Sequence, residues 1–486
     1  MPHKLKIVSI ASEVYPFSKS GGLADVVCSL SKILKQLGHD IIVITPFYGE
    51  IIDRKKYNLK PVFENVSLEM DKETKIKVNY LQGYLDNDLP IYFVANEKFF
   101  SRKKELYGST KENKRFYLFD VAALKLIDLL KFRANIIHCH DWHAGLVPEL
   151  LHKNFNNNKY PSLKNSKTVF TIHNLAFQLG YDWWQVPLTE KDYGRKALPK
   201  FYDPKMEYIN FAKRAITHAD IINTVSEQYA EEILTKDFGQ DLQRILNSNK
   251  KKLFGIINGI DEKEYNPATD PGLAKNYSVD SLYFKKQNKE ALQKLFNLPV
   301  KDVPVIGMTS RLVEQKGFNL LDKILETLLS FDLHFIIMGD GDKKYVSIIN
   351  KMEKKYPKKL AYSKFEQKIE TSIYAGGDML LMPSRFEPCG LNQLYALRYG
   401  CIPIVHKIGG LADTITEFNP KTNKGNGFTF KHYHEYKLLM AITRAMVTYQ
   451  HKDVWKGLVE KAMRMSSFWT FSAKKYVVLY KKVLKI

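Results

Sequence analysis

The feature that most constrains the fold is an alternation of short apolar strands with amphipathic helices, which runs along the chain and then starts again. Predicted strands are 5–11, 41–46, 91–95, 136–140, 168–172 and 221–225 in the first series, and 305–309, 333–338, 379–383 and 402–405 in the second. Helical patterns include 23–37, 116–132, 317–330, 343–355, 391–399 and 435–449. This alternation is typical of α/β proteins with a doubly wound parallel sheet.

The restart of the pattern predicts two domains. A chain of 486 residues exceeds the ~300 residues at which single hydrophobic cores stop growing. The segment 258–302 has clusters of Pro, Asn and charged residues and no strong strand, so it is the expected junction. We therefore expect a Rossmann-like domain at 1–257 and a second one from 258 to 467, facing a deep cleft between them.

Composition narrows the possible partners. Apolar residues make up 45% of the chain, but no apolar run approaches the ~18 residues of a membrane helix. The first predicted strand begins too early to leave room for a signal peptide, and the four cysteines form no C-x-x-C pair, so we expect a cytoplasmic protein. The net charge of +22 raises the question of nucleic acid. The lysines are spread along the chain without a nucleic-acid motif, which favours a solvated basic surface or a field that attracts an anionic ligand.

A glycine turn follows the first predicted strand. Lys19-Ser20-Gly21-Gly22-Leu23 leads into a helix, and its Gly-Gly-Leu-Ala-Asp stretch recurs at 409–413 after another strand. Paired glycines let backbone amides approach a ligand, and a helix N-terminus favours phosphate. Two such turns predict two phosphate-binding positions, with Lys19 as a point charge beside the first. A tight strand–helix turn without a ligand is the alternative.

Two loops of the second domain carry charge at the ends of predicted strands. The loop 310–317 contains Arg311 and Lys316, two cations suited to a diphosphate, although surface Arg–Lys pairs are also common. The loop 384–391 contains Glu387 and ends in Gly390 and Leu391, which begin a helix. Glu387 is expected to hold sugar hydroxyls or stabilise a cation, or else to cap that helix.

First-domain strand ends carry histidines and an aspartate. His138-Cys139-His140-Asp141-Trp142-His143 ends one strand, and Thr171-Ile172-His173-Asn174 ends the next. The histidine spacing fits no structural zinc pattern. Asp141 and Trp142 suit a sugar, and His173 either meets the reacting group or is an ordinary loop residue. Two Asp-x-Asp triplets, 86–88 and 340–342, occur in contexts that indicate a hairpin loop and a tight turn, so no metal is expected.

Taken together, these motifs resemble the bacterial glycogen synthases and plant starch synthases, glycosyltransferase family five, of the GT-B fold. The resemblance covers nearly the whole chain. It rests on the Lys19 turn, the stretches 138–146, 171–174, 258–261 and 385–391, the loop with Arg311 and Lys316, and the second Gly-Gly-Leu at 409–411.

The resemblance implies retaining transfer of glucose from ADP-glucose, or alternatively UDP-glucose, to the 4-hydroxyl at the non-reducing end of an α-1,4-glucan such as glycogen, without a metal or other cofactor. It implies a catalytic set of Glu387, His173, Asp141, Arg311 and Lys316. Donor-binding residues would be Lys19, Gly22, Asp25, Asn258, Arg311, Lys316, Phe365, Gly390 and Leu391, and acceptor-binding residues Tyr107 and Trp142. Residues 468–486 would form a helix that returns to the first domain.

The sequence departs from the family pattern at two positions. Ser20 stands where the family has Thr, and Tyr395 stands eight residues after Glu387, which argues against families with two glutamates at that spacing. The nearest alternative function is that of another retaining GT-B sugar transferase, acting on a lipid or a small acceptor. A catalytically inactive glucan-binding protein is a further alternative. It would be expected to lack the charged site residues, yet Lys19, Arg311, Lys316 and Glu387 are all present.

Overall fold

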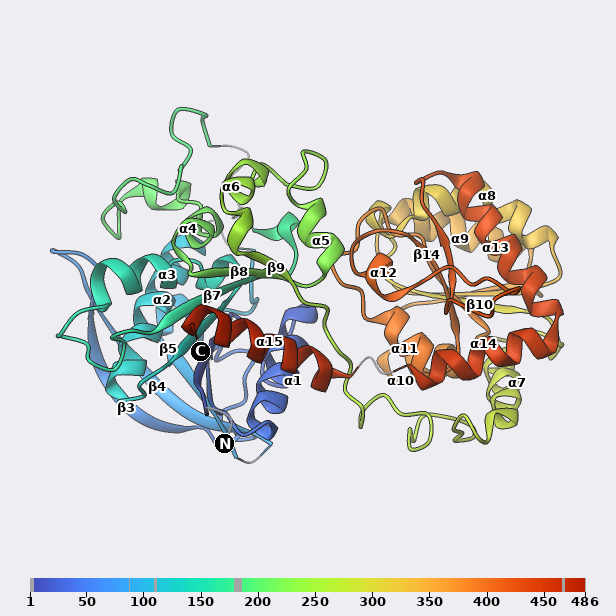
Figure 1. The fold of residues 1–486 in the computed structure, drawn as a ribbon, viewed down its shortest axis with the longest axis horizontal. Helices are drawn as coiled ribbons and strands as arrows, with labels where there is room; N and C mark the ends of the chain where they lie inside the picture. The colour runs from blue at the N-terminus through green and yellow to red at the C-terminus, as the bar shows by residue number, and fades with distance from the viewer. Residues whose placement is uncertain (1–3, 87, 109–111, 179–185, 466–467, 486) are drawn as a thin grey trace. The chain divides into compact units, whose positions relative to one another are not determined.

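The computed structural model describes residues 4–86, 88–108, 112–178, 186–465 and 468–485. The chain forms two compact units (Figure 1). Unit 1 consists of Met1–Ile256 together with Trp469–Ile486, and unit 2 of Ile257–Phe468. Each unit is a sheet covered by helices around its own apolar core.

Unit 1 contains a nine-stranded sheet in the order β3-β4-β5-β2-β1-β6-β7-β8-β9. Its strands are β1 Lys6–Ile10, β2 Asp40–Pro46, β3 Lys60–Glu69, β4 Lys75–Leu85, β5 Leu89–Ala95, β6 Ile136–His140, β7 Lys167–Ile172, β8 Ile221–Thr224 and β9 Leu253–Gly255. Neighbouring strands from β5 to β9 are parallel, whereas β3, β4 and β5 form an antiparallel edge. The central strands are largely buried and mostly apolar because helices cover both faces of a parallel sheet, although β6 carries the buried polar residues His138 and His140.

The helices of unit 1 come from both ends of the chain. They are α1 Gly22–Gln36, α2 Glu112–Leu129, α3 Val147–Leu150, α4 Phe211–His218, α5 Glu227–Glu232, α6 Gln243–Ser248 and α15 Trp469–Leu484. Helix α15 contacts α1 and β7 (Figure 1). Its Tyr480 hydroxyl lies 2.8 Å from Nδ1 of His138, and its Tyr476 hydroxyl accepts a hydrogen bond from Asn223. The C-terminal helix is therefore part of the polar core of unit 1.

Unit 2 contains a six-stranded parallel sheet in the order β12-β11-β10-β13-β14-β15. Its strands are β10 Val305–Thr309, β11 His334–Met338, β12 Leu360–Ser363, β13 Met379–Met382, β14 Ile402–His406 and β15 Phe428–Phe430. Its helices are α7 Lys285–Leu295, α8 Phe318–Ser330, α9 Lys343–Lys355, α10 Gln367–Gly376, α11 Asn392–Arg398, α12 Gly409–Thr414, α13 Glu435–Gln450 and α14 Lys452–Arg464.

Each sheet has a point where the strand order reverses. In unit 1, β1 lies between β2 and β6, and in unit 2, β10 lies between β11 and β13. Loops that leave such neighbouring strands in different directions open a crevice at their carboxyl ends, where ligands of α/β proteins bind. The loops after β1, β6, β10 and β13 are therefore the expected positions of ligand-binding residues.

The doubly wound α/β prediction is confirmed, and ten predicted strands lie within a residue or two of observed ones. The prediction missed the antiparallel strands β3 and β4, the short strands β9, β12 and β15, and helix α7 within the expected junction. In β4, Lys and Asn alternate with apolar residues, because one face of this edge is exposed.

Candidate active site

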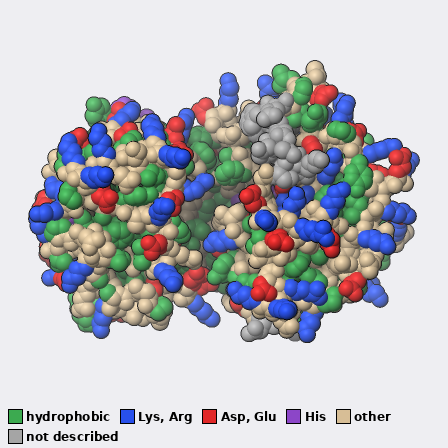
Figure 2. Space-filling view, turned by 180° about the vertical axis from the view of Figure 1, so that it is seen from behind, with side chains coloured by type: hydrophobic (Ala, Val, Ile, Leu, Met, Phe, Trp, Pro, Cys, Tyr) green, Lys and Arg blue, Asp and Glu red, His purple; other side chains and the backbone are tan. Residues whose placement is uncertain are grey.

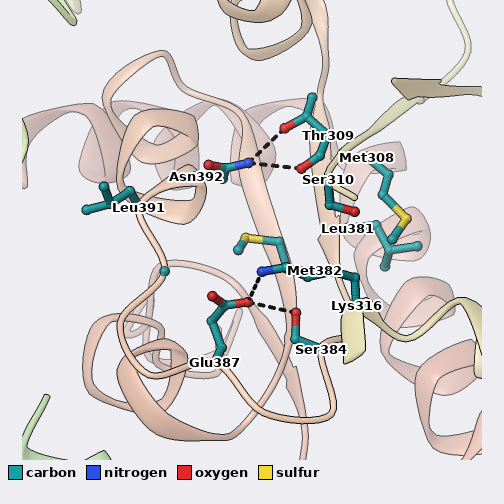
Figure 3. Close-up of a pocket in the computed structure, with 11 residues that line it drawn as sticks. Met308, Thr309, Ser310, Lys316, Leu381, Met382, Ser384, Glu387, Leu391 and Asn392 are labelled. Carbon is teal, nitrogen blue, oxygen red and sulfur yellow. Dashed lines mark hydrogen bonds and ion pairs between the residues drawn. The ribbon is translucent and has the colours of Figure 1, made fainter. Parts of the chain in front are cut away.

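The strand ends of unit 2 form a pocket around Glu387 (Figure 3). Lys316, in the short helical turn Glu314–Lys316 just before α8, places its Nζ 2.6 Å from Oε2 of Glu387. The hydroxyl of Ser384 donates to the same oxygen at 2.9 Å. Oε1 accepts no hydrogen bond from the residues that the structure describes. Glu387 is therefore held by one oxygen and has the other available to a ligand.

The opposite side of this pocket is formed by the loop before α11. Gly390 has φ +69°, a conformation that favours glycine, and Gly390 and Leu391 line the pocket with Asn392. Asn392 Nδ2 donates to both the carbonyl and the hydroxyl oxygen of Thr309, at 2.9 and 2.8 Å. Asn392 therefore joins the end of β10 to the loop after β13, and the pocket walls are fixed by side chains rather than by loop packing alone.

Three other residues predicted to bind the donor do not line this pocket as described. Arg311 is exposed, and its guanidinium lies 3.5 Å from Oε1 of Gln315. Asn258 is buried and hydrogen-bonds Cys389, whose pKa burial raises to about 12. Phe365 follows β12 and is 50% exposed, with β11 between its strand and β10. Stacking of Phe365 on a base stays a prediction.

In unit 1, the Lys19 turn is open to solvent. Lys19 Nζ lies 2.8 Å from Oδ2 of Asp25 in the first turn of α1. A Cβ built on Gly21 or Gly22 meets no other described atom within 4 Å. Burial raises the pKa of Glu13, whose carboxylate nevertheless accepts the Ser20 amide at 2.5 Å and so holds the turn in place. The turn combines an exposed cation with accessible backbone.

The second Gly-Gly-Leu copy is packed against neighbouring backbone, whereas the first is open, and phosphate binding at either copy stays a prediction. The amide of Gly410 donates to the carbonyl of Glu387 at 3.0 Å. A Cβ on Gly409 or Gly410 would overlap the backbone of Glu387 or Cys389. Helix α12 has only six residues. These glycines allow the loop before α12 to pack against the loop that contains Glu387.

Asp141 ends β6 in an unusual backbone conformation. Its φ of 57° and ψ of 176° belong to a region that is essentially confined to glycine. Its Oδ1 accepts the amide of His173 at 2.8 Å and Nε2 of Gln178 at 2.6 Å. Burial raises the pKa of Asp141 to about 7, so this carboxyl group exchanges a proton near neutral pH. Backbone strain and a perturbed pKa at one residue are typical of a functional site.

His173 lies beside Asp141 at the end of β7. Its Nε2 is 3.0 Å from Nδ1 of His140, and desolvation lowers the pKa of His173 to about 3. The imidazole is therefore neutral at physiological pH. The structure brings Asp141 and His173 together at the ends of the adjacent strands β6 and β7.

Trp142 and Tyr107 are packed more tightly than a role in stacking on an acceptor suggests. Trp142 is 7% exposed, and its ring lies 4.3 Å from that of His143. The Tyr107 ring stacks on the same His143 ring, with 4.7 Å between the ring centroids. The Tyr107 hydroxyl lies 2.7 Å from the hydroxyl of Ser12. Acceptor binding by Trp142 and Tyr107 stays a prediction.

The carboxylates of the first Asp-x-Asp triplet are paired with lysines of α1. Asp86 contacts Lys32 at 3.0 Å and Asp88 contacts Lys35 at 2.7 Å, while Asn87 lies outside the described residues. In the second triplet, Gly341 bridges to Leu312 and Asp342 precedes α9, which is the predicted turn. Within the described ranges, no three His, Cys, Asp or Glu side chains form a metal-binding group.

Sequence reasoning missed the residues that act as partners within the site. These are Glu13, Gln178, Ser384 and Asn392, whose hydrogen bonds orient the Lys19 turn, Asp141, Glu387 and the pocket wall respectively. Ser384 lies in the motif that contains Glu387, so its nearness was a usable signal. The other three depend on contacts that no local pattern reveals.

Two surface properties bear on partners. No helix in the described part of the chain is long and apolar enough to cross a membrane. On the face shown in Figure 2, Lys and Arg side chains are scattered among acidic and apolar ones and do not form a single stripe.

Comparisons with known proteins identify the family of this chain. The family model described as starch synthase catalytic domain matches residues 6–248, and the model described as glycosyl transferases group 1 matches residues 290–456. Proteins named glycogen synthase from Pseudothermotoga lettingae and Thermotoga maritima are each 40% identical to the chain, over 490 and 493 residues, with 99% of both chains covered.

Solved structures identify the same family and its fold. The catalytic domain of starch synthase IV from Arabidopsis thaliana, bound to ADP and acarbose, matches with a TM-score of 0.84 and 31% identity over 100% of both chains. A sucrose-phosphate synthase from Thermosynechococcus elongatus matches with a TM-score of 0.60 and 16% identity over 99% of both chains, which supports the GT-B fold alone. The chain is a glycosyltransferase with the GT-B fold, and it belongs to the family of bacterial glycogen synthases and plant starch synthases.

Proposed function

We propose that this glycogen synthase transfers glucose from ADP-glucose to the 4-hydroxyl at the non-reducing end of an α-1,4-glucan, with retention of configuration. The observation that carries this proposal is the ion pair of Lys316 with Glu387 in a pocket that Gly390 and Leu391 also line. This pocket combines a cation for a phosphate with a carboxylate for a sugar.

The donor would bind with its diphosphate toward the cations. Lys316 and Arg311 would take the two phosphates, and Lys19 is a further cation proposed to bind the donor. Departure of the nucleoside diphosphate is the main development of charge in glycosyl transfer, and fixed cations stabilise it. Lys19 and Lys316 are each paired with a carboxylate in the free protein, so the diphosphate would replace Asp25 and Glu387 as their partner.

The glucose ring would lie against Glu387. Its free oxygen would accept a sugar hydroxyl, and its negative charge would stabilise the anomeric carbon as that centre gains oxocarbenium character. His173 is neutral and therefore suited to hydrogen-bond a sugar oxygen without adding charge. Asp141 would lie beside the reacting groups, where a pKa of about 7 suits a group that takes up a proton and releases it again.

ADP-glucose is proposed as the donor because the Arabidopsis structure that matches over the full chain is bound to ADP. The same structure holds acarbose, a carbohydrate, which supports a glucan acceptor. Phe365 would stack on the base, a contact that either adenine or uracil can make.

The test is incorporation of labelled glucose into glycogen by the purified protein. ADP-glucose and UDP-glucose would be supplied separately, each with and without EDTA, and the new linkage would be assigned from its anomeric proton. We expect α-linked incorporation from ADP-glucose that EDTA does not reduce. Faster transfer from UDP-glucose would overturn the donor assignment, loss with EDTA would overturn the metal-independent mechanism, and no incorporation from either donor would overturn the proposal as a whole.

A further inference from the structure

Two histidines of β6 have no role in the proposed reaction. His138 and His140 are two residues apart, so both side chains lie on the same face of the sheet. Their exposed fractions are 1% and 0%, and their rings lie 4.0 Å apart. Buried polar rings are retained only where their nitrogens find partners, so the hydrogen bonds of each ring indicate what it does.

The two rings are connected to different parts of unit 1. His138 contacts the hydroxyl of Tyr480 through Nδ1 and that of Thr171 through Nε2, at 2.8 and 2.6 Å. His140 contacts Nε2 of His173 through Nδ1 at 3.0 Å, and the hydroxyl of Ser9 through Nε2 at 3.1 Å. His138 therefore fixes α15 to the sheet, whereas His140 connects Ser9 to a residue of the site.

Ser9, His140 and His173 form a hydrogen-bonded series, in which the nitrogen that carries the hydrogen on one ring determines which nitrogen carries it on the next. Burial lowers the pKa of His140 well below its usual range, and that of His173 to about 3, so both rings are neutral. A neutral imidazole has one N–H and one bare nitrogen. Of the facing nitrogens, Nδ1 of His140 and Nε2 of His173, one must therefore carry hydrogen and the other must accept it.

The Ser9 hydroxyl determines the direction of these hydrogen bonds. Its buried hydroxyl has Nε2 of His140 as its hydrogen-bond partner among the described residues. A buried hydroxyl leaves its own hydrogen unsatisfied unless it donates. Ser9 therefore donates to Nε2 of His140, Nδ1 of His140 donates to Nε2 of His173, and the remaining hydrogen of His173 lies on Nδ1.

We propose that His140, oriented by Ser9, is a positioning residue that holds His173 as the Nδ1–H tautomer, so that His173 presents an N–H donor to an oxygen of the bound sugar. Nδ1 of His173 makes no hydrogen bond with a described residue, and the His173 side chain is only half-buried. Its donor is thus available to a ligand. The inference about the sugar rests on the proposed function, whereas the tautomer itself does not.

Two substitutions of His140 separate its two hydrogen bonds. In His140→Asn the side-chain amide nitrogen takes the position of Nδ1 and keeps a donor toward His173. In His140→Gln the amide reaches toward Ser9 and leaves Nε2 of His173 without its donor. Both variants place an amide in the same buried position, so we expect similar melting temperatures. We expect kcat to fall on the order of 10- to 100-fold in His140→Gln and clearly less in His140→Asn.

A measurement on the wild-type protein tests the tautomer without relying on activity. ¹⁵N NMR of histidine-labelled protein distinguishes bare from protonated ring nitrogens, and His173→Asn identifies the signals of His173. We expect a protonated Nδ1 and a bare Nε2 from pH 6 to 8, with the preference lost in Ser9→Ala. A protonated Nε2 in the wild type, or a kcat for His140→Gln equal to or above that for His140→Asn, overturns the proposal. A correct tautomer in a protein that incorporates no glucose would instead count against the proposed function alone.

Discussion

Lys316 and Glu387 lie 71 residues apart in the chain, and their charged atoms lie 2.6 Å apart. The side chains are 20% and 10% exposed, so the pair is mostly shielded from water. Shielding strengthens the attraction, and it also makes either charge costly to leave alone. A substrate that takes Lys316 away from Glu387 must offer charge in return, which a diphosphate does.

Replacing Lys316 should therefore affect turnover far more than a surface lysine does. We expect Lys316→Ala to lower kcat on the order of 10²-fold or more, because the leaving diphosphate loses a fixed cation. Lys323→Ala is the matched control: this lysine of α8 contacts Glu435 at 3.3 Å and is 59% exposed. Glucose incorporation at saturating donor measures both. Near-normal turnover of Lys316→Ala would refute the role of Lys316 in the leaving-group step.

The two Gly-Gly-Leu copies should respond to alanine in opposite ways. In Gly410→Ala the new Cβ overlaps the carbonyl of Cys389, and overpacking of this kind lowers the free energy of unfolding by about 1–3 kcal/mol. In Gly22→Ala the Cβ meets open space, and alanine favours the helix by up to about 1 kcal/mol. Urea unfolding of the two variants checks these signs.

The same Gly22→Ala variant should bind the donor less well, because its methyl group enters the space that the proposed diphosphate occupies. We expect a rise in the donor KM on the order of 10-fold. Gly457→Ala in α14 is the control, since its Cβ also meets no other described atom within 4 Å. It should show the gain in stability without the change in KM. An unchanged KM in Gly22→Ala would show that the turn does not approach the donor.

The sequence predicted the strand ends well and the partners poorly. Lys316 and Glu387 each follow a short apolar strand, and parallel strands place their carboxyl ends at one edge, so a site there followed from local pattern. Gln178 and Asn392 were missed because their importance lies in what they contact, which is set by tertiary structure. The antiparallel edge was missed because its exposed face breaks the apolar runs on which the strand predictions relied.

The second glycine pair shows why an identical motif can mislead. Gly22 and Gly410 occupy equivalent places in a five-residue repeat, yet one is open and the other packs against Cys389. Glycine permits close approach of a backbone to any group, and the sequence does not tell whether that group is a ligand or the chain itself.

Asp141 should make the stability of unit 1 depend on pH with a sign opposite to that of an ordinary carboxylate. Burial raises its pKa from 3.8 to about 7, so the folded state binds more protons than the unfolded state between these values. Its contribution to stability is present at low pH and is lost as pH rises toward 7. Asp141→Asn removes the titration and keeps an acceptor for the His173 amide.

We therefore expect Asp141→Asn to unfold at a higher temperature than the wild type at pH 8, with a gain of up to about 4 kcal/mol, and at a similar temperature near pH 4. The buried histidines destabilise both proteins below pH 6.5, so their effect cancels in the difference. Melting curves at pH 4, 6 and 8 check the trend. A difference that grows toward acid pH would show that Asp141 is stabilised as the anion.

Tyr480 should stabilise unit 1 without taking part in catalysis. Tyr480→Phe removes the hydroxyl that lies 2.8 Å from Nδ1 of His138 and leaves a buried polar atom unpaired, which costs about 1–3 kcal/mol. Val478→Ala on the same helix is the control, because Val478 is 68% exposed and its loss should change stability by less than about 0.5 kcal/mol.

Urea unfolding measures the stability of both helix variants, and glucose incorporation well below the melting temperature measures their activity. Because His138 makes no hydrogen bond to His173, kcat of Tyr480→Phe should stay within about 3-fold of the wild type. Loss of activity without loss of stability would mean that the contact of α15 with His138 affects the site through the adjacent rings of His138 and His140, whose centroids lie 4.0 Å apart. The orientation of His140 and His173 would then depend on the C-terminal helix as well as on Ser9.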